Sequence, residues 1–167
     1  MNKGLYVVMG VAGSGKSLVG SSLARALGVD FLEGDDFHTA QSIAKMAAGV
    51  PLTDDDRAGW LQTLSLRLRT AEEAGSGVVI ACSALKRPYR DILREGAPDT
   101  HFVFLRGARK LIAKRLADRP EHFMRASMLD SQFATLEEPS PDENAWVYDI
   151  RRPPEEIVND LVNRVSL

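Results

Sequence analysis

The sequence predicts an α/β domain in which a parallel five-stranded sheet is covered by helices on both faces. Five short apolar runs alternate along the chain with segments whose apolar residues recur at helical spacing. The 167 residues suit one domain, expected over 1–167, and 44% of them are hydrophobic, which is enough for a core. A glycine-rich segment follows the first apolar run directly, at the strand end where such sheets bind ligands.

The strands are expected at the five apolar runs, because each run is too short for a helix and is followed by polar or turn residues. These runs are Leu5–Met9, Phe31–Leu32, Val78–Cys82, His101–Leu105 and Ala145–Asp149.

Helices are expected between and after these strands, each with a recognisable start or stop. The first begins near Ser17 and ends at Gly28, and a short one covers 40–49. A long one starts at the capping pair Thr53 and Asp56. Four more are expected. One begins at Pro88, one is centred on Leu111–Leu116, one covers 127–136, and the last begins at Pro154. We expect 38–75 to form a helical substrate-binding region and 117–127 to form a mobile lid.

Composition excludes several classes of protein. The formal net charge of −2 argues against a nucleic-acid-binding protein, which would be strongly basic. The one cysteine, Cys82, lies in an apolar run, so we expect a buried, inert thiol. No signal peptide is recognisable, and no apolar stretch approaches the ~20 residues of a membrane helix. We therefore expect a cytoplasmic protein without membrane contact.

The glycine-rich segment Gly10–Ser17 reads GVAGSGKS and fits the phosphate-binding pattern G-x-x-x-x-G-K-[ST]. Glycines let the backbone wrap so that its N–H groups face phosphate oxygens, and the following helix adds its positive end. Lys16 can reach the β- and γ-phosphates, and the Ser17 hydroxyl can ligate Mg²⁺. The expected nucleotide-binding residues are Gly10, Gly13, Ser14, Gly15, Lys16 and Ser17. A flexible linker is the alternative.

An acidic group follows the second strand, which we expect to lie beside the first. Glu33 and Asp35 alternate on an extended segment, so they should point the same way. Asp35 would accept or orient an acceptor hydroxyl, and Glu33 would hold a metal-bound water. His38 is a candidate for a hydrogen bond to the substrate. The alternatives are a solvated acidic turn and a bystander histidine.

The third strand lacks the acid that large nucleotide-hydrolysing families place there, since it continues as Ala81-Cys82-Ser83-Ala84-Leu85-Lys86-Arg87. This absence disfavours GTPases and motor ATPases and favours small-molecule kinases. Lys86 and Arg87 could hold an anionic substrate or the transferred phosphoryl group. Surface charge on a loop is the alternative.

Together these motifs resemble the gluconate kinases (gluconokinases), members of the shikimate-kinase-like and nucleoside-monophosphate-kinase-like group of P-loop kinases. The resemblance covers nearly the whole chain. Besides the phosphate loop, it includes Gly34-Asp35 with His38, Lys45-Met46, Gly49-Val50-Pro51-Leu52, Asp54-Asp55-Asp56-Arg57, Trp60-Leu61, Cys82-Ser83-Ala84-Leu85-Lys86, Tyr89-Arg90-Asp91, Leu93-Arg94, and Ser131-Gln132-Phe133 with Leu136-Glu137-Glu138-Pro139. The chain departs from the family pattern at Thr39, Ser42 and Glu121.

The resemblance implies ATP-dependent phosphorylation of D-gluconate at its 6-hydroxyl, and it implies a homodimer; Mg²⁺ is expected from the phosphate loop. It suggests Asp35 as the catalytic carboxylate. It also suggests Arg57, Lys86 and Arg90 as contacts for gluconate or the phosphoryl group, which agrees with the cations that an anionic sugar acid needs. Asp54, Asp55 and Asp56 equally suit a helix N-terminus.

Arginines flank the expected lid. Such cations can close over the phosphates and stabilise the negative charge that spreads over the phosphoryl oxygens in the transition state. We expect Arg115 and Arg119 to contact the nucleotide, with Arg119 in the catalytic role because it lies at the junction of helix and lid. Lid solubility is the alternative for these charges.

Two rival functions remain at this stage. One is a kinase of the same fold with another anionic acceptor, such as shikimate or a nucleoside monophosphate. The other is a nucleotide-dependent switch, which the absence of a guanine-reading N-K-x-D motif disfavours.

Overall fold

The computed structural model of the chain describes residues 4–118 and 126–165. Its strands are β1 (Leu5–Met9), β2 (Asp30–Glu33), β3 (Val78–Ala81), β4 (His101–Arg106) and β5 (Ala145–Asp149). Its helices are α1 (Lys16–Leu27), α2 (Ala40–Ala47), α3 (Asp54–Ala74), α4 (Arg87–Gly96), α5 (Arg109–Ala117), α6 (Ala126–Thr135) and α7 (Pro154–Val165). Two short 3-10 turns are η1 (Gly34–Phe37) and η3 (Pro141–Glu143).

The strands form one parallel sheet in the order β2-β3-β1-β4-β5, so the predicted fold class is confirmed. The expectation that the second strand lies beside the first is wrong, because β3 pairs with both β1 and β2. The crossover through α1 passes over one strand position, which β3 fills later. Helical spacing in the sequence does not tell how many positions a crossover spans.

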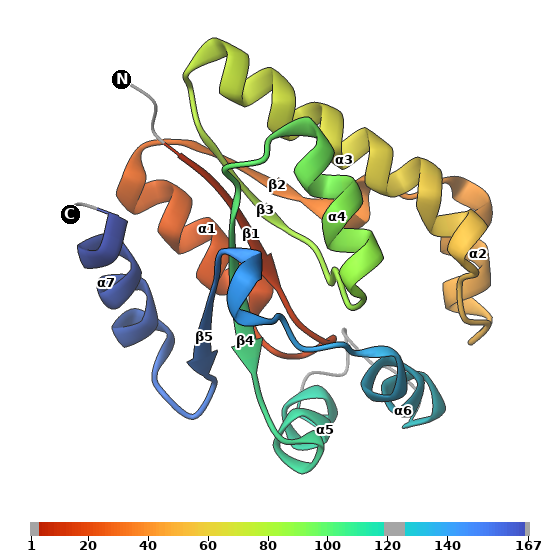
Figure 1. Cartoon of the computed structure of the whole chain (residues 1–167). Helices are drawn as coiled ribbons and strands as arrows, with labels where there is room; N and C mark the ends of the chain where they lie inside the picture. Colours follow the sequence, from red (N-terminus) through yellow and green to blue (C-terminus); the bar gives the residue numbers. More distant parts are fainter. Residues whose placement is uncertain (1–3, 119–125, 166–167) are drawn as a thin grey trace.

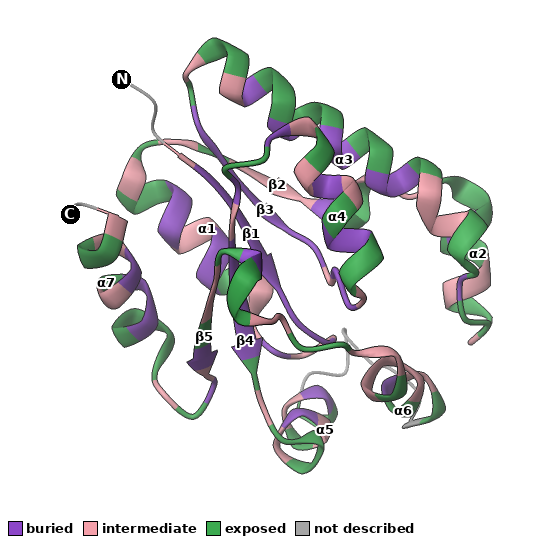
Figure 2. Ribbon diagram, in the orientation of Figure 1, coloured by how far each residue is buried: buried purple, intermediate pink, exposed green. Residues whose placement is uncertain are grey.

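Helices cover both faces of the sheet, with α1 and α7 on one face and α3 and α4 on the other (Figure 1). Alternate residues of β1 point to opposite faces, as the two-residue period of a strand requires. Tyr6 and Val8 join the apolar cluster beneath α1 and α7, and Val7 and Met9 join the cluster beneath α3 and α4. The buried surfaces therefore run along the inner sides of the helices and through the central strands (Figure 2).

The predicted helix ends are confirmed at two places. Thr53 Oγ1 accepts a hydrogen bond from the Asp56 N–H at 3.1 Å, and the Asp56 carboxylate accepts one from the Thr53 N–H at 2.9 Å. Gly28 ends α1 with φ 69°, a left-handed conformation that suits glycine. The capping pair thereby fixes the start of the long α3 helix.

The carboxyl ends of the three strands β1, β2 and β3 bring three segments together. They are the glycine loop after β1, η1 after β2, and the loop 82–86 after β3. A Cβ on Gly34 would lie 2.4 Å from the Ala81 carbonyl oxygen, so η1 approaches β3 this closely only because residue 34 is glycine.

The cysteine that follows β3 has the environment expected from the sequence. Cys82 is buried, and burial raises the pKa of its thiol to about 12, as expected for an inert thiol.

Candidate active site

The glycine loop between β1 and α1 adopts a conformation that depends on its glycines. Gly13 and Gly15 have φ values of 81° and 97°, which are strained for other residues. A Cβ on Gly13 would also lie 2.8 Å from Leu116 Cγ, on α5. The loop therefore packs closely against α5, with its backbone exposed toward the neighbouring cavity.

Lys16 lies along the inside of this loop. Its ammonium donates to the carbonyl oxygens of Gly10 and Val11, each at 3.0 Å. Burial lowers the pKa of Lys16, although the negative charges of Asp35 and Glu33 partly counteract that effect. A half-buried cation held by neutral carbonyls gains from an anionic partner, which is what a polyphosphate supplies.

Ser14 gives a second indication that the loop suits an anion. Its side chain is buried, and its Oγ has no hydrogen-bond partner within the described part of the chain. Buried hydroxyls are nearly always hydrogen-bonded, so an orphan one beside a cluster of backbone N–H groups indicates a missing acceptor. A phosphate oxygen fits this requirement.

A cavity of about 590 Å³ extends from the glycine loop toward the connection between β5 and α7. Its lining includes the glycine loop with Glu33 and Asp35, and also Arg115, Ile150, Arg152, Pro154 and Ile157. A cavity lined by both charged and apolar side chains suits the phosphates and the base of a nucleotide.

The acidic pair reaches this cavity by a different geometry from the one expected. The extended segment stops at Glu33, and Asp35 lies on the 3-10 turn η1, so the alternation argument is wrong for this pair. Both carboxylates nevertheless line the cavity beside Lys16. Ser17 Oγ donates a hydrogen bond to Glu33 Oε2, and burial raises the pKa of Glu33 despite this bond.

Asp35 lies at the exposed side of the cavity, with 75% of its side-chain surface accessible. His38 Nε2 lies 3.6 Å from Asp35 Oδ1, and this imidazole holds the pKa of the Asp35 carboxyl below its ordinary value. Asp35 is therefore ionised at neutral pH and can accept a hydrogen bond from a hydroxyl.

His38 is itself held by Trp60 on α3. The two rings stack with centroids 4.0 Å apart, and Trp60 Nε1 donates to the Gly34 carbonyl oxygen at 2.7 Å. The His38 Nδ1 atom is buried without a hydrogen-bond partner among the described residues. Trp60 is buried in the core, and it also anchors the backbone of the acidic turn.

Arg57 and Lys86, two of the expected substrate contacts, converge on Tyr89. Both cations lie over its ring, at 5.4 and 5.7 Å from the centroid. The Tyr89 hydroxyl donates to Asp54 Oδ1 at 2.5 Å and accepts from Arg57 Nη1 at 3.2 Å, and Lys86 Nζ lies 3.7 Å from the same Asp54 oxygen. This cluster was missed by sequence reasoning, although Tyr89 follows Lys86 by one helical turn.

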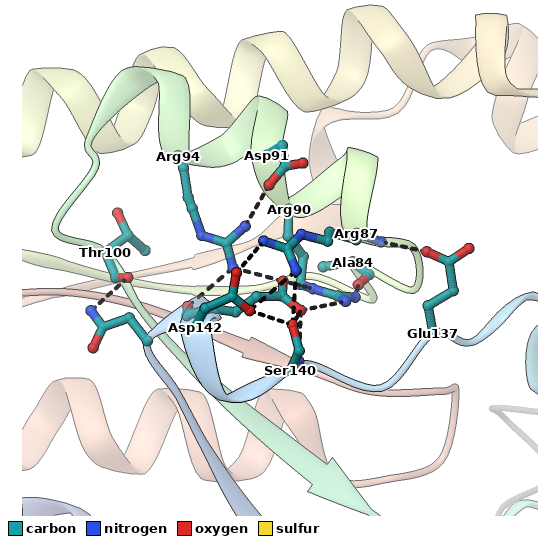
Figure 3. A network of polar contacts seen from close by, with 11 residues as sticks. Ala84, Arg87, Arg90, Asp91, Arg94, Thr100, Glu137, Ser140 and Asp142 are labelled. Atoms are coloured by element: carbon teal, nitrogen blue, oxygen red, sulfur yellow. Dashed lines mark hydrogen bonds and ion pairs between the residues drawn. The ribbon is translucent and has the colours of Figure 1, made fainter.

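Arg90 does not belong to this group. It was expected to contact gluconate or the phosphoryl group, but the structure buries it in another contact. Its side chain is fully buried and donates to both carboxylate oxygens of Glu143 and to the Ala84 carbonyl oxygen (Figure 3). The neighbouring Arg87 pairs with Asp142 at 2.7 Å. Both guanidiniums therefore connect α4 to the segment before β5.

The two arginines expected at the lid have different outcomes. Arg115 lines the cavity and donates from Nη2 to the Ile150 carbonyl oxygen at 2.7 Å. Arg119 and most of the expected lid, residues 119–125, lie outside the described residues.

Two other kinds of feature are absent from the described part of the chain. No group of three or more His, Cys, Asp or Glu side chains there could hold a metal alone. None of the helices there has the length and apolar character that a membrane span requires.

Comparisons with known proteins agree with this geometry. A family model described as "AAA domain" matches residues 5–139. The thermoresistant gluconokinase of Escherichia coli (strain K12) is 47% identical over 163 residues, which cover 97% of this chain and 93% of the relative. The gluconokinase of Gluconobacter oxydans (strain 621H) is 44% identical over 156 residues, with coverage of 93% and 88%. The crystal structure of a gluconokinase from Sinorhizobium meliloti 1021 superposes with a TM-score of 0.90 at 46% identity, and the match covers 99% of this chain and 93% of that one. The chain therefore carries this AAA domain and belongs to the gluconokinase family.

Proposed function

We propose that this protein is a gluconokinase that transfers the γ-phosphoryl group of ATP to the 6-hydroxyl of D-gluconate, giving 6-phospho-D-gluconate and ADP. The observation that most supports the proposal is that Lys16, Ser17, Glu33 and Asp35 line one cavity. The similarity to gluconokinases along the whole chain supports the choice of acceptor.

Asp35 is proposed as the catalytic carboxylate that orients the acceptor hydroxyl. Its lowered pKa keeps it ionised, so it can accept the hydrogen bond of the 6-hydroxyl throughout the reaction. Phosphoryl transfer passes through a loose transition state in which little bonding to the acceptor has formed. A carboxylate of low basicity is sufficient there, because the hydroxyl becomes strongly acidic only as the new bond to phosphorus forms.

Ser17 and Glu33 are the proposed residues for Mg²⁺. Their oxygen atoms are hard ligands, and Mg²⁺ is usually bound through one or two protein oxygens together with substrate phosphates and water. The absence of a larger acidic cluster in the described residues agrees with such a site. When bound, the ion neutralises charge on the β- and γ-phosphate oxygens.

The acceptor region is proposed to lie within 38–75 and around the loop after β3. Arg57 and Lys86 supply the positive charge that the gluconate carboxylate requires, with Tyr89 positioning both. Asp54 offsets part of the Lys86 charge, which leaves Arg57 as the stronger candidate. His38 acts through Asp35 by lowering the pKa of its carboxyl. Its Nδ1 atom has no hydrogen-bond partner among the described residues, which makes it a candidate for contact with a gluconate hydroxyl.

Arg115 and Arg119 are proposed as the cations on the nucleotide side, with Arg119 acting from a lid over 117–127. A guanidinium that contacts the transferring phosphoryl group stabilises charge on its oxygens, and a lid excludes water that would compete with gluconate. We further propose a single-domain protein that forms a homodimer, which light scattering tests. We also propose that it is cytoplasmic, which cell fractionation tests, and that it binds neither nucleic acid nor membranes.

The decisive test is product formation across a panel of acceptors. ADP release is measured with gluconate, other sugar acids, shikimate and nucleoside monophosphates, with and without Mg²⁺, and phosphorylated products are identified by mass spectrometry. We expect gluconate to be preferred and chelation of Mg²⁺ to abolish turnover. Phosphorylation of shikimate or a nucleotide without turnover of gluconate would refute the assignment, and acceptor-independent hydrolysis alone would indicate a nucleotide switch.

A further inference from the structure

Gln132 on α6 forms an unusual contact with the phosphate loop. The Ala12 N–H donates to Gln132 Oε1 at 2.7 Å, across 120 residues of sequence and in a partly buried environment. Ala12 lies in the first half of the loop, before Gly13, and lines the nucleotide cavity. One backbone donor of the loop is thus held by a side chain from a distant helix.

The chain that follows Gln132 is bonded to the acceptor side of the cavity. The Glu137 N–H donates to the Leu85 carbonyl oxygen at 2.7 Å, and Glu137 Oε1 accepts from the Arg87 N–H at 2.9 Å. These two bonds flank Lys86, a proposed contact for gluconate. Between them and Gln132, Leu136 packs against both apolar clusters of the domain.

Residues 132–137 therefore contact both halves of the reaction site at once. One end is bonded to the loop that holds the donor phosphates, and the other end is bonded to the loop that holds the acceptor. Figure 1 shows α6 beyond the carboxyl ends of the strands. A segment that is hydrogen-bonded to both loops in this way can influence their separation.

We propose that Gln132 is a positioning residue that sets the phosphate loop, through Ala12, relative to the acceptor-side loop 85–87. The proposal rests on the proposed kinase function. The remaining amides of Gly13–Ser17 and the Lys16 ammonium would still bind ATP without Gln132. What changes is the position of the terminal phosphoryl group relative to the acceptor, and a misplacement of about 1 Å can cost roughly 10²-fold in rate.

The kinetic test compares Gln132→Met with a matched control. Methionine keeps the length and apolar stem of glutamine but removes the acceptor oxygen. We expect kcat to fall about 10-fold, equivalent to about 1.4 kcal/mol, with both KM values changed less than about 3-fold. ADP release without phosphogluconate formation should rise relative to coupled transfer. Asn163→Met, at an exposed position of α7 away from the cavity lining, should change none of these quantities.

The connection itself is tested with Glu137→Met. If Gln132 and Glu137 act through one rigid segment, the effects of the two single substitutions on kcat will not multiply in the double variant. Multiplicative effects would show that the two contacts act independently and would overturn the proposed linkage. An unchanged kcat and unchanged coupling in Gln132→Met would overturn the positioning role itself.

A measurement without gluconate separates this inference from the proposed function. Hydrogen exchange of the Ala12 amide in the protein alone should be slow, accelerate in Gln132→Met, and stay slow in Gln132→Glu, which keeps the acceptor. Equal exchange in all three proteins would refute the contact. Absence of gluconate turnover in the unmodified protein would instead refute the assigned reaction, while the exchange result would still decide the role of Gln132 in the loop.

Discussion

Arg90 and Glu143 form an ion pair that is closed to solvent on both sides, with Nε and Oε1 2.7 Å apart and side chains 0% and 1% exposed. Arg94 donates to the same Glu143 oxygen at 2.8 Å, and the Ser140 N–H donates to the other oxygen at 2.8 Å. Glu143 thus connects α4 with η3 directly before the edge strand β5. Both oxygens of its carboxylate accept hydrogen bonds. At this point of the fold, polar contacts rather than apolar side chains therefore hold α4 and η3 together.

Removal of the Glu143 charge should strongly destabilise the fold. Glu143→Gln leaves the Arg90 guanidinium buried without its counter-charge, and breaking such a pair costs about 3–5 kcal/mol. Urea unfolding followed by circular dichroism measures this loss. Glu138→Gln is the control, because the Glu138 pair with Arg106 is solvent-exposed and should be worth about 1 kcal/mol or less. Equal, small losses in both variants would contradict the importance of the buried pair.

The same carboxylate predicts how stability depends on pH. Burial raises the pKa of Glu143, but the bonds from Arg90 and Arg94 outweigh it and lower the pKa to about 2, from an ordinary value of 4.5. A lowered native pKa means that the unfolded state binds the proton more readily. The contribution of Glu143 should be complete above pH 4.5 and be lost as the pH falls toward 2.

This pH dependence is measured as the free energy of unfolding between pH 7 and 2 in the unmodified protein and in Glu143→Gln. The variant, which has no carboxyl at this position, should lose less stability over the acidic range. Parallel curves would show that other carboxyl groups cause the acid sensitivity.

Asp35→Asn should lower kcat by about 10²-fold or more, the usual scale of assistance by a general base, while ATP affinity stays nearly intact. The amide keeps the shape of the side chain but accepts a hydroxyl proton poorly. Steady-state kinetics and nucleotide titration measure the two effects. Asp36→Asn is a matched control, since Asp36 is an exposed neighbour outside the cavity lining. Normal turnover in Asp35→Asn would remove Asp35 from the catalytic role.

Tyr89→Phe should raise the KM for gluconate about 5- to 10-fold without changing the KM for ATP. The substitution removes the hydroxyl that bonds Asp54 and Arg57, and the net contribution of a hydrogen bond is about 0.5–1.5 kcal/mol. Tyr148→Phe removes a comparable bond to Asp160, on the far side of the sheet, and should leave both KM values unchanged. A change in the KM for ATP alone would place Tyr89 on the nucleotide side.

Local sequence patterns predicted the elements well because their causes are local. Leu5–Met9 and Ala145–Asp149 are strands with the expected bounds, and the capping pair at Thr53 and Asp56 is present as predicted. Each depends on residues within a few positions of one another. The glycine loop followed the same rule, since its pattern is contained in eight residues.

The incorrect predictions concern relationships between distant residues. The position of β3 between β1 and β2 depends on crossovers that pass over a strand, which spacing does not reveal. Arg90 follows a predicted ligand-binding loop, but its partner Glu143 lies 53 residues later in a segment without a recognisable motif. For the same reason, the contact of Gln132 with Ala12 could not be inferred from either segment alone.

The stacking of Trp60 on His38 gives the acceptor region an optical property of its own. The chain has two tryptophans, and Trp146 lies away from the cavity, stacked on His101 at 4.8 Å. Replacing Trp146 with phenylalanine leaves a single emitting indole whose ring touches His38 and whose nitrogen holds the backbone of the acidic turn. Its fluorescence then reports on displacement of the acidic turn, so the binding of a sugar acid can be followed without an attached dye.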